Sequence, residues 1–568
     1  MDQKKITKQL KLIIKLMELH DENPFKIRGY QSVVNMLDRG DVSIEGLDLE
    51  GLQAVNGIGK SIAEVIYSIG QTQTHPYLET LLAKTPTGIV EVLEIKGLGP
   101  KKVKVLWEEL NITSIHELLE ACQSGQVAKT KGFGEKTQES ILSALAFREV
   151  NKGKWLYAEA EALAQEMAQQ LTSLDGVEAL VPVGEFARKT EIIEQVEWLI
   201  CTEKLDSVLI QLSENQEFEQ HFKISSPFKW RGCWGSAAVK VILHFTTPQQ
   251  LVKDKIVRTG SKAHLLYQVE GGKTFVESIA TAESFADEAA AYHHVGINWI
   301  PEEMREGTFE FEWIKTHQVE ELVTDKDLKG ILHNHSTYSD GRHTLKQMAE
   351  YCRELGYQYL GMSDHSRSAF YAAGLDIDRV AKQQAEIDEL NRAMAPFKIF
   401  KGIESDILVD GSLDYPDEVL ASFDFVVASV HAVLNMDKNK ATTRLIKAIG
   451  NPYTTILGHP TGRLLLRREG YPLDHQAIID ACAAYGVVIE INANPWRLDL
   501  DWRWIQYALE KGVMLSINPD AHQLEGYADM RYGVIAGRKG GLTRNMTFNA
   551  LTLPEMEAYL QQRKAKIK

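Results

Sequence analysis

Histidine and aspartate gather in one short stretch of the chain, ILHNHSTYSDGRH, at residues 331–343. An apolar lead-in delivers His333 and His335, and a polar turn then supplies Asp340 and His343. On a β-strand, residues two positions apart point the same way, so both imidazoles can face one metal ion or two adjacent ions. Taken alone, such a pair is more often incidental, and Asp340 alone is more often a turn residue. The rest of the chain decides between these interpretations.

Other metal-competent side chains follow the ends of successive apolar runs beyond residue 328. Short apolar runs alternate there with longer amphipathic stretches, which is the α/β pattern of parallel strands and crossover helices. In a β/α barrel the C-terminal ends of the strands surround one mouth, so residues far apart in sequence converge. The polar residues at the ends of the candidate strands are His333, His335, Asp364, His365, Glu404, Asp406, His431, His459, Glu490, Asn492, Asn494, Asp520 and His522.

A different pattern repeats in the first 150 residues, as VNGIGKSIAEVI (55–66), IKGLGPKKVKVL (95–106) and TKGFGEKTQESIL (130–142). Each copy predicts a helix-hairpin-helix, whose glycines let the backbone approach a phosphate and whose second helix directs free N–H groups toward it. An ordinary helix–helix turn with a C-terminal glycine is the alternative for any single copy. Contacts to phosphate carry no base information, so the predicted DNA binding is not sequence-specific. The candidate contacts are Gly57, Gly59, Lys60, Gly97, Gly99, Lys102, Gly132, Gly134 and Lys136.

Length, cysteine usage and charge set broad bounds on the protein. A chain of 568 residues predicts several domains. Its five cysteines lie far apart without a C-x-x-C pair, and it has neither a signal-peptide pattern nor an apolar run of membrane-spanning length, so we expect a soluble, cytoplasmic protein. A net charge of −15 argues by itself against a nucleic-acid partner. However, residues 1–150 hold 18 Lys+Arg against 20 Asp+Glu, so most of the excess lies elsewhere, where a carboxylate-rich metal site would be acidic.

The stretch NPFKIRGYQSVVNML (23–37) and the first two hairpins resemble the N-terminal regions of family X DNA polymerases, and the third hairpin resembles the bacterial members known as PolX. In that family the first two hairpins grip template and primer around a gap or nick, which makes Arg28, Lys60 and Lys102 candidate contacts. Residues 151–315 resemble the palm and thumb of the same family, through VGEFARKTEIIEQVEW (183–198) and RTGSKAH (258–264) among other segments.

The palm-like region departs from the family at its catalytic positions. The two paired aspartates of the family become Gln195 and Glu197, the third falls at Ile242, and a serine becomes Glu185. Two-metal nucleotidyl transfer needs anionic oxygens at fixed positions, which an amide, a longer carboxylate and an alkyl group do not supply. We therefore expect polymerase activity to be lost and the palm to serve as a scaffold or DNA clamp. In the alternative, substitute ligands come from Glu191, Glu194 and Glu197.

The C-terminal portion resembles the PHP (polymerase and histidinol phosphatase) domain, a distorted seven-stranded barrel with a trinuclear metal centre. The resemblance implies nine ligands: His333, His335, Asp340, His365, Glu404, His431, His459, Asp520 and His522. Nine ligands suit three ions, with Glu404 as a bridge between them. Mixed His and carboxylate ligation favours Mn²⁺, Zn²⁺ or Fe²⁺ over Mg²⁺. We assign catalysis foremost to His333, His335, Glu404, Asp520 and His522. Supporting or phosphate-contacting roles are expected for His343, Asp406 and Arg463.

The predicted architecture is multidomain α+β, with a helix-hairpin-helix region, a nucleotidyltransferase-like palm and thumb, and a C-terminal PHP distorted (β/α)7 barrel. The predicted boundaries are 1–80 (lyase-like), 81–150 (fingers-like), 151–257 (palm), 258–315 (thumb), 316–327 (linker) and 328–568 (PHP). The predicted function is that of a monomeric, metal-dependent 3′-5′ exonuclease or 3′-end-processing phosphodiesterase in DNA repair, acting on gapped, nicked or 3′-recessed DNA. Its rivals are a gap-filling polymerase with proofreading, a phosphatase of small monoesters such as histidinol phosphate, and a non-catalytic DNA-binding scaffold.

Overall fold

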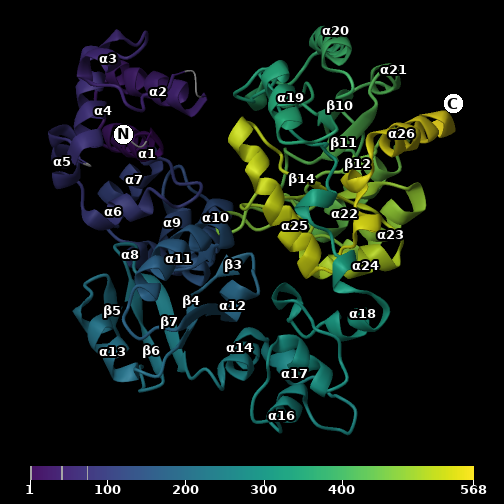
Figure 1. The fold of residues 1–568 in the computed structure, drawn as a ribbon. Coiled ribbons are helices and arrows are strands. Elements are labelled where there is room, and N and C mark those ends of the chain that lie inside the picture. Colours follow the sequence, from purple (N-terminus) through teal and green to yellow (C-terminus); the bar gives the residue numbers. More distant parts are fainter. Residues whose placement is uncertain (1–2, 40–41, 73, 568) are drawn as a thin grey trace. The chain divides into compact units, whose positions relative to one another are not determined.

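The computed structural model describes residues 3–39, 42–72 and 74–567. The chain forms two compact units, Met1–Lys152 and Gly153–Lys568 (Figure 1). The predicted domains 1–80 and 328–568 include six residues that lie outside the described part, namely 1, 2, 40, 41, 73 and 568. Among the described residues, none of the helices combines the length and hydropathy that a membrane span requires.

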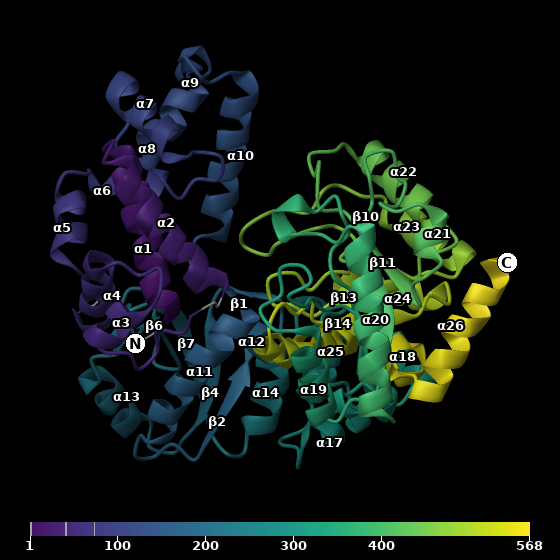
Figure 2. The same ribbon diagram turned by 90° about the horizontal axis from the view of Figure 1, so that it is seen from above.

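The first unit is helical throughout. Its first two helices pack along each other (Figure 2), and the apolar face of the first buries Leu10, Ile13 and Met17 in the core of the unit. Apolar residues every three or four positions produce this face, so burial rather than intrinsic propensity holds the helix in place. The helices are α1 (Gln3–Leu19), α2 (Pro24–Arg39), α3 (Leu49–Ala54), α4 (Lys60–Thr72), α5 (Pro76–Ala83), α6 (Thr87–Val92), α7 (Pro100–Leu110), α8 (Ile115–Gln123), α9 (Gln126–Lys129) and α10 (Glu135–Asn151).

The second unit begins with a five-stranded mixed sheet in the order β2-β4-β7-β6-β5, in which β4 and β7 are parallel. Its strands are β2 (Ala179–Val183), β4 (Val196–Cys201), β5 (Phe218–Gln220), β6 (Lys229–Trp234) and β7 (Val239–Thr246), with a separate pair of β1 (Trp155–Leu156) and β3 (Ile192–Ile193). The helices beside the sheet are α11 (Tyr157–Thr172), α12 (Gly184–Ala187) and α13 (Leu205–Glu214). A helical segment follows, with α14 (Leu251–Thr259), α15 (Lys262–Leu265), α16 (Phe275–Ile279), α17 (Glu288–His294) and α18 (Glu310–Thr316).

Seven parallel strands form the last sheet, in the sequential order β8 to β14. They are β8 (Gly330–Ile331), β9 (Tyr359–Met362), β10 (Lys398–Asp406), β11 (Phe425–Ser429), β12 (Ile456–Leu457), β13 (Val488–Asn492) and β14 (Leu515–Asn518). The helices that accompany them (Figure 1) are α19 (Leu345–Glu354), α20 (Ile377–Met394), α21 (Asp417–Leu420), α22 (Lys438–Ile449), α23 (His475–Tyr485), α24 (Ile505–Glu510), α25 (Met530–Lys539) and α26 (Leu553–Ile567). All of these strand residues except Lys398 and Lys401 of β10 are buried, as expected for a parallel sheet that is covered on both sides.

Side-chain amides close the gap between the first and last strands. The Nδ2 of Asn549 donates to the carbonyls of Gly330 in β8, at 2.9 Å, and Ile517 in β14, at 2.7 Å, while its Oδ1 accepts from the N–H of Ile517. The Oδ1 of Asn518 accepts from the N–H of Leu332 at 3.0 Å. Buried backbone groups at these two edges thereby gain the partners that a neighbouring strand would have given. The sheet is thus a nearly closed seven-stranded barrel.

A buried lysine joins the barrel to the segments that precede it. Lys539, at the end of α25, is 1% exposed, and its Nζ donates to Glu306 and to the carbonyls of Arg188 and Glu303. The carboxylate of Glu306 also accepts from Arg188 Nε at 3.1 Å. The predicted linker 316–327 is packed as well, because its Leu322 and Val323 are fully buried. Ionic and apolar contacts together hold the second unit.

Candidate metal centre and phosphate-binding hairpins

The C-terminal ends of the barrel strands carry the candidate ligands. Each strand stops where its apolar run ends, and the polar residues that follow turn inward over the mouth. His333 and His335 follow β8, Glu404 lies near the end of β10, and Asp520 and His522 follow β14. The remaining candidates are Asp340 in the loop after β8, His365 after β9, His431 after β11 and His459 after β12.

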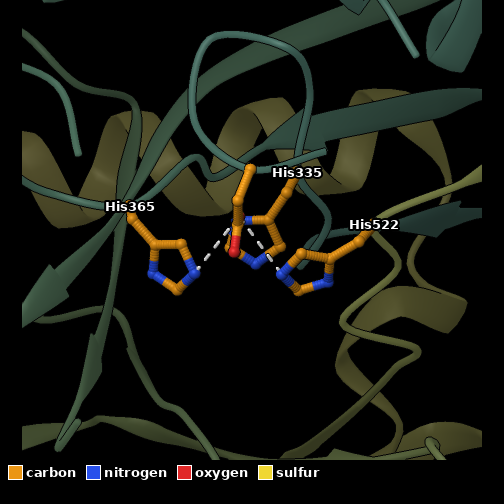
Figure 3. Close-up of side chains that lie close together, drawn as sticks. His335, His365 and His522 are labelled. Atoms are coloured by element: carbon orange, nitrogen blue, oxygen red, sulfur yellow. Dashed lines mark ion pairs between the residues drawn. The ribbon is translucent and has the colours of Figure 1, made fainter. Parts of the chain in front are cut away.

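The structure brings all nine of these side chains into four overlapping groups, within each of which the ligand atoms lie within 4.8 Å of one another. Figure 3 shows one group, in which the rings of His365 and His522 flank His335 at centroid distances of 4.3 and 4.1 Å. Asp340 completes this group. The other groups are His333, Glu404 and His459; His333, His335 and Asp520; and His365, Glu404 and His431.

Glu404 lies at the centre of the cluster and is fully buried. Its Oε1 is 3.3 Å from Nε2 of His333, 3.1 Å from Nε2 of His431 and 3.0 Å from Nε2 of His459. Its Oε2 lies 2.9 Å from Nδ1 of His365. A carboxylate that faces several imidazoles through both oxygens is suited to bridge two metal ions.

Three of the histidines have Nδ1 held by a hydrogen-bond partner, while Nε2 points into the cluster. Nδ1 of His333 lies 2.7 Å from Glu490, Nδ1 of His431 lies 2.5 Å from Asp406, and Nδ1 of His522 lies 2.9 Å from the carbonyl of Asp520. Metal-binding histidines in proteins show this pattern, because the outer hydrogen bond fixes the tautomer and the ring orientation.

Several buried polar atoms of the cluster lack a hydrogen-bond partner among the described residues, including Nε2 of His333, Nδ1 of His365 and Oε2 of Glu404. The last two atoms lie 2.9 Å apart without the geometry of a hydrogen bond. Leaving such groups unpaired costs free energy, and a cation shared by both removes that cost. The donor set and the orphaned atoms therefore both fit metal ions at this mouth.

Burial and charge favour the ligand-competent forms of Glu404 and His335. The neighbouring carboxylates instead raise the pKa of His431 to about 10 and that of His522 to about 9, so these two imidazoles give up a proton when they bind a metal. Burial alone would raise the pKa of Glu404, but His431, His333 and His365 hold it well below its usual range. Burial, His522 and His365 lower the pKa of His335 to about 3. Ionised carboxylate and neutral imidazole are the forms that bind metals.

Asp364 shapes the loop that presents Asp340. Its fully buried carboxylate accepts hydrogen bonds from the backbone and side chain of both Ser336 and Ser339, and from Nε2 of Gln383 at 2.6 Å. Burial raises the pKa of this carboxyl group, and the hydrogen bonds oppose that rise. This network holds the turn, so Asp340 is both a turn residue and a member of the cluster.

Two residues near the centre were not among the candidate ligands or supporting residues, namely Glu490 and Arg497. Glu490 appeared in the sequence only as a polar residue at a strand end, while Arg497 lies five residues past its strand, where the pattern gives no signal. Arg497 Nε lies 3.5 Å from Asp520 Oδ2. Arg463, for which a supporting or phosphate-contacting role was predicted, instead binds the carbonyls of Arg497 and Leu498 and thus supports that loop. His343 belongs to none of the four groups.

We predict that Glu490→Gln weakens metal binding by about 10- to 100-fold, because the amide no longer fixes the charge and tautomer of His333. Competition with a chelator, followed by metal analysis of the protein, measures this loss. Asp501→Asn is the matched control, since Asp501 carries an ion pair with Arg463 away from the cluster. Equal metal retention by Glu490→Gln and wild type would contradict the role given to Glu490.

The palm positions at which the family has its catalytic aspartates, Gln195, Glu197 and Ile242, do not form a cluster of carboxylates. Glu197 and Ile242 are register partners on β4 and β7. The carboxylate of Glu197 lies within hydrogen-bond distance of Nε2 of the buried His244, at 2.8 Å, and accepts from Gln195 Nε2 at 2.9 Å, while burial lowers the pKa of His244. Its carboxylate also fills the space below Gly184, where an added Cβ would lie 2.8 Å from Glu197 Oε1. Within the described residues, none of the metal-competent groups includes a palm side chain.

The three hairpins of the first unit share one backbone geometry. The first glycine of each hairpin has a left-handed φ, of 96° at Gly57 and 87° at both Gly97 and Gly132. Residues other than glycine rarely adopt this conformation. An added Cβ would have no neighbouring atom within 4 Å at five of the hairpin glycines, namely Gly59, Gly97, Gly99, Gly132 and Gly134. The hairpins precede α4, α7 and α10, so each one exposes a helix N-terminus beside Lys60, Lys102 or Lys136. A cavity of about 650 Å³ at the second hairpin is lined by three cationic side chains and also by three acidic ones, together with Gly97 and Gly99 among other residues. The cationic side chains are Arg28, Lys101 and Lys102, and the acidic ones are Glu18, Asp21 and Glu22.

Comparison with known families agrees with this arrangement. A helix-hairpin-helix domain model matches residues 1–75, a SAM-like helix-hairpin-helix tandem model matches residues 89–146, and a PHP domain model matches residues 332–494. Helix-hairpin-helix domains bind DNA. The PHP match covers β9 to β13 and seven of the nine candidate ligands, and it ends before β14, Asp520 and His522.

Relatives of two kinds were found. A probable phosphatase of Thermoanaerobacter sp. (strain X514) is 27% identical over 42% of this chain and 98% of its own length, and one of Caldanaerobacter subterraneus subsp. tengcongensis is 33% identical over 22% of this chain and 51% of its own length. The DNA polymerase/3′-5′ exonuclease PolX of Bacillus subtilis (strain 168) is 35% identical over 99% of this chain and 100% of its own length. With hairpins, palm-like sheet and barrel all inside that match, the chain belongs to the PolX family.

Proposed function

We propose that this chain is a metal-dependent DNA phosphodiesterase, acting as a 3′-5′ exonuclease or a 3′-end-processing enzyme in DNA repair. The observation that carries the proposal is the cluster of nine metal-competent side chains at the barrel mouth. It occurs in a chain that also has helix-hairpin-helix domains and that matches, along its whole length, a relative named DNA polymerase/3′-5′ exonuclease PolX. The phosphate to be cut would bind at the mouth, where the ligand atoms converge.

The nine side chains would hold the ions, with His333, His335, Glu404, Asp520 and His522 closest to the chemistry. Bound metal ions lower the pKa of a coordinated water to produce hydroxide near neutral pH and neutralise charge on phosphate oxygens. Arg497, 18% exposed in its side chain, is the cation placed to bind a phosphate oxygen. Glu490 and Asp406 would keep His333 and His431 in the orientation that binding requires.

The mixed donor set supports Mn²⁺, Zn²⁺ or Fe²⁺ rather than Mg²⁺, because imidazole suits these ions better than it suits magnesium. We propose three ions, the number that the resemblance to the PHP domain implies, and the sharing of members among the four groups is consistent with ions bridged by carboxylates. Glu404 belongs to two of the groups and is the proposed bridge.

In this proposal the palm no longer makes DNA. Glu197 is engaged by His244, and Arg188 donates to Glu306 and to the carbonyl of Thr259. Neither side chain is left to bind a metal–triphosphate complex. The palm would instead serve as a scaffold that connects hairpins and barrel, with the domain boundaries proposed from the sequence.

The proposed substrate is a gapped, nicked or 3′-recessed DNA, gripped through its phosphates by the hairpins and without sequence preference. The protein would act as a monomer, with Arg28, Lys60 and Lys102 among the cationic contacts. Arg28 and Lys102 line the cavity at the second hairpin, and Lys60 is exposed beside the first.

Incubation of the purified full chain with 3′-labelled gapped and recessed DNA tests the proposal. We expect release of labelled nucleotides that requires Mn²⁺ and is abolished by a chelator, and no incorporation of deoxynucleotides into the same substrates. A small phosphate monoester serves as a parallel substrate, because probable phosphatases match the barrel alone. Hydrolysis of the monoester without any release from DNA would overturn the proposal, and template-directed extension would overturn the loss of polymerase activity.

A further inference from the structure

Two large aromatic side chains project into solvent from the loop after β9. Phe370 is 87% exposed and Tyr371 is 70% exposed, on a short 3-10 turn, Phe370–Ala372. Scattered exposed aromatics need no explanation, but two adjacent ones on a single turn beside a candidate active site are unusual. The first question is whether the loop holds them in place.

Small buried residues anchor the turn on both sides. Ala369 and Ala372 are 0% and 1% exposed, so the backbone is packed against the barrel while the two rings point outward. Ser368 donates from its hydroxyl to Asp406 Oδ2 and from its N–H to Asp414 Oδ2, both at 2.7 Å. An added Cβ at Gly374 would lie 1.9 Å from the carbonyl of Ser366, so the loop closes tightly on itself. The two rings are thus presented by a fixed support.

The support is connected directly to the metal centre. The Tyr371 ring centroid lies 6.2 Å from that of His365, which belongs to two of the four ligand groups. Asp406, which holds Ser368, also fixes Nδ1 of His431. A ligand bound at the metals by its phosphate would therefore bring the group one sugar away to the Tyr371 ring, with Phe370 adjacent on the same turn.

We propose that Phe370 and Tyr371 form a stacking platform for the unpaired nucleobase at the 3′ end of the strand being cut. Every nucleobase offers a π-face, so aromatic side chains bind single-stranded ends with little sequence preference, in keeping with the hairpins. A paired terminal base is already stacked in its duplex, so the platform favours frayed or mismatched ends. This inference rests on the proposed phosphodiesterase function and names the group that the site recognises beside the phosphate.

A substrate that lacks the terminal base isolates the platform. Phe370→Ala, Tyr371→Ala and the double variant are compared with wild type on two single-stranded oligonucleotides, one with a normal 3′-terminal nucleotide and one with a tetrahydrofuran abasic residue there. We expect the double variant to lose roughly tenfold or more in kcat/KM, mostly through KM, on the normal end and to match wild type on the abasic end. Tyr485→Ala, which removes a 55% exposed aromatic at the end of α23, should change neither rate. Equal rates for wild type and double variant on the normal end, or equal losses on both ends, would overturn the platform.

A binding measurement keeps the platform separate from catalysis. Quenching of 2-aminopurine placed at the 3′ end reports stacking whether or not the strand is cut. Quenching by wild type that disappears in the double variant supports the platform, even where wild type releases no nucleotide, and in that case only the proposed function fails. Equal quenching by wild type and the double variant overturns the platform while leaving nucleotide release as the test of function.

Discussion

His333→Ala and Asp520→Ala are each expected to reduce Mn²⁺-dependent nucleotide release by roughly a thousandfold. Both residues are buried, and both belong to the group that also contains His335. Removing one of these ligands displaces an ion or leaves it loosely held, and a catalytic metal contributes several kcal/mol of transition-state stabilisation, at about 1.4 kcal/mol per factor of ten. Initial rates on 3′-labelled DNA, with metal content measured on the same preparations, give the result.

The control for this prediction is another histidine. His221→Ala alters an exposed residue of the palm-like sheet region and should leave the rate within twofold of wild type. Metal content should fall in the two ligand variants and not in the control. Near-wild-type release by His333→Ala with an intact metal content would remove the barrel mouth as the place of cleavage.

Lys539→Met is expected to destabilise the second unit by about 3–5 kcal/mol. The lysine is 1% exposed and Glu306 is little exposed. Replacing the ammonium group therefore leaves the carboxylate of Glu306 with Arg188 as its one remaining cationic partner, in a low-dielectric setting. Burial alone would raise the pKa of Glu306, and Lys539 and Arg188 together hold it below its usual range. Urea unfolding, followed by tryptophan fluorescence, measures the change in the free energy of unfolding.

Lys511→Met is the matched control, because its ammonium group forms an exposed ion pair with Asp480 and should contribute nothing measurable. Combining Lys539→Met with Glu306→Gln should not recover the lost stability, since Arg188 keeps its charge and then loses its carboxylate partner. An unfolding curve for Lys539→Met that overlays that of wild type would mean that the buried pair contributes no net stability.

The barrel and the gathering of metal-competent side chains at its mouth were largely predictable from sequence because the signal is local and repeated. Each apolar run stops at a metal-competent residue, and a parallel sheet forces all such stops to one side. The glycine hairpins were predictable for the same reason, since a left-handed φ at Gly57, Gly97 and Gly132 demands a specific residue type.

Other features depend on contacts that no local pattern records. The sequence predicts a supporting or phosphate-contacting role for Arg463, and the structure adds that its guanidinium donates to the loop of Arg497, whose own side chain lies beside Asp520. Glu490 gains its role only through its contact with His333, which lies 157 residues earlier in the chain. The palm substitutions were visible as missing carboxylates, but the pairing of Glu197 with His244 required the register of two strands.

The amide of Asn549 has a consequence for the order in which the protein matures during synthesis. The barrel needs this residue to join Gly330 to Ile517, and the metal cluster needs Asp520, so both are completed only when the final part of the chain has been made. The helical first unit has its own core and can fold long before that point. If the proposed function holds, a nascent chain would be able to bind DNA before it could cut it, and translation would delay cleavage until β14 and Asn549 have been made.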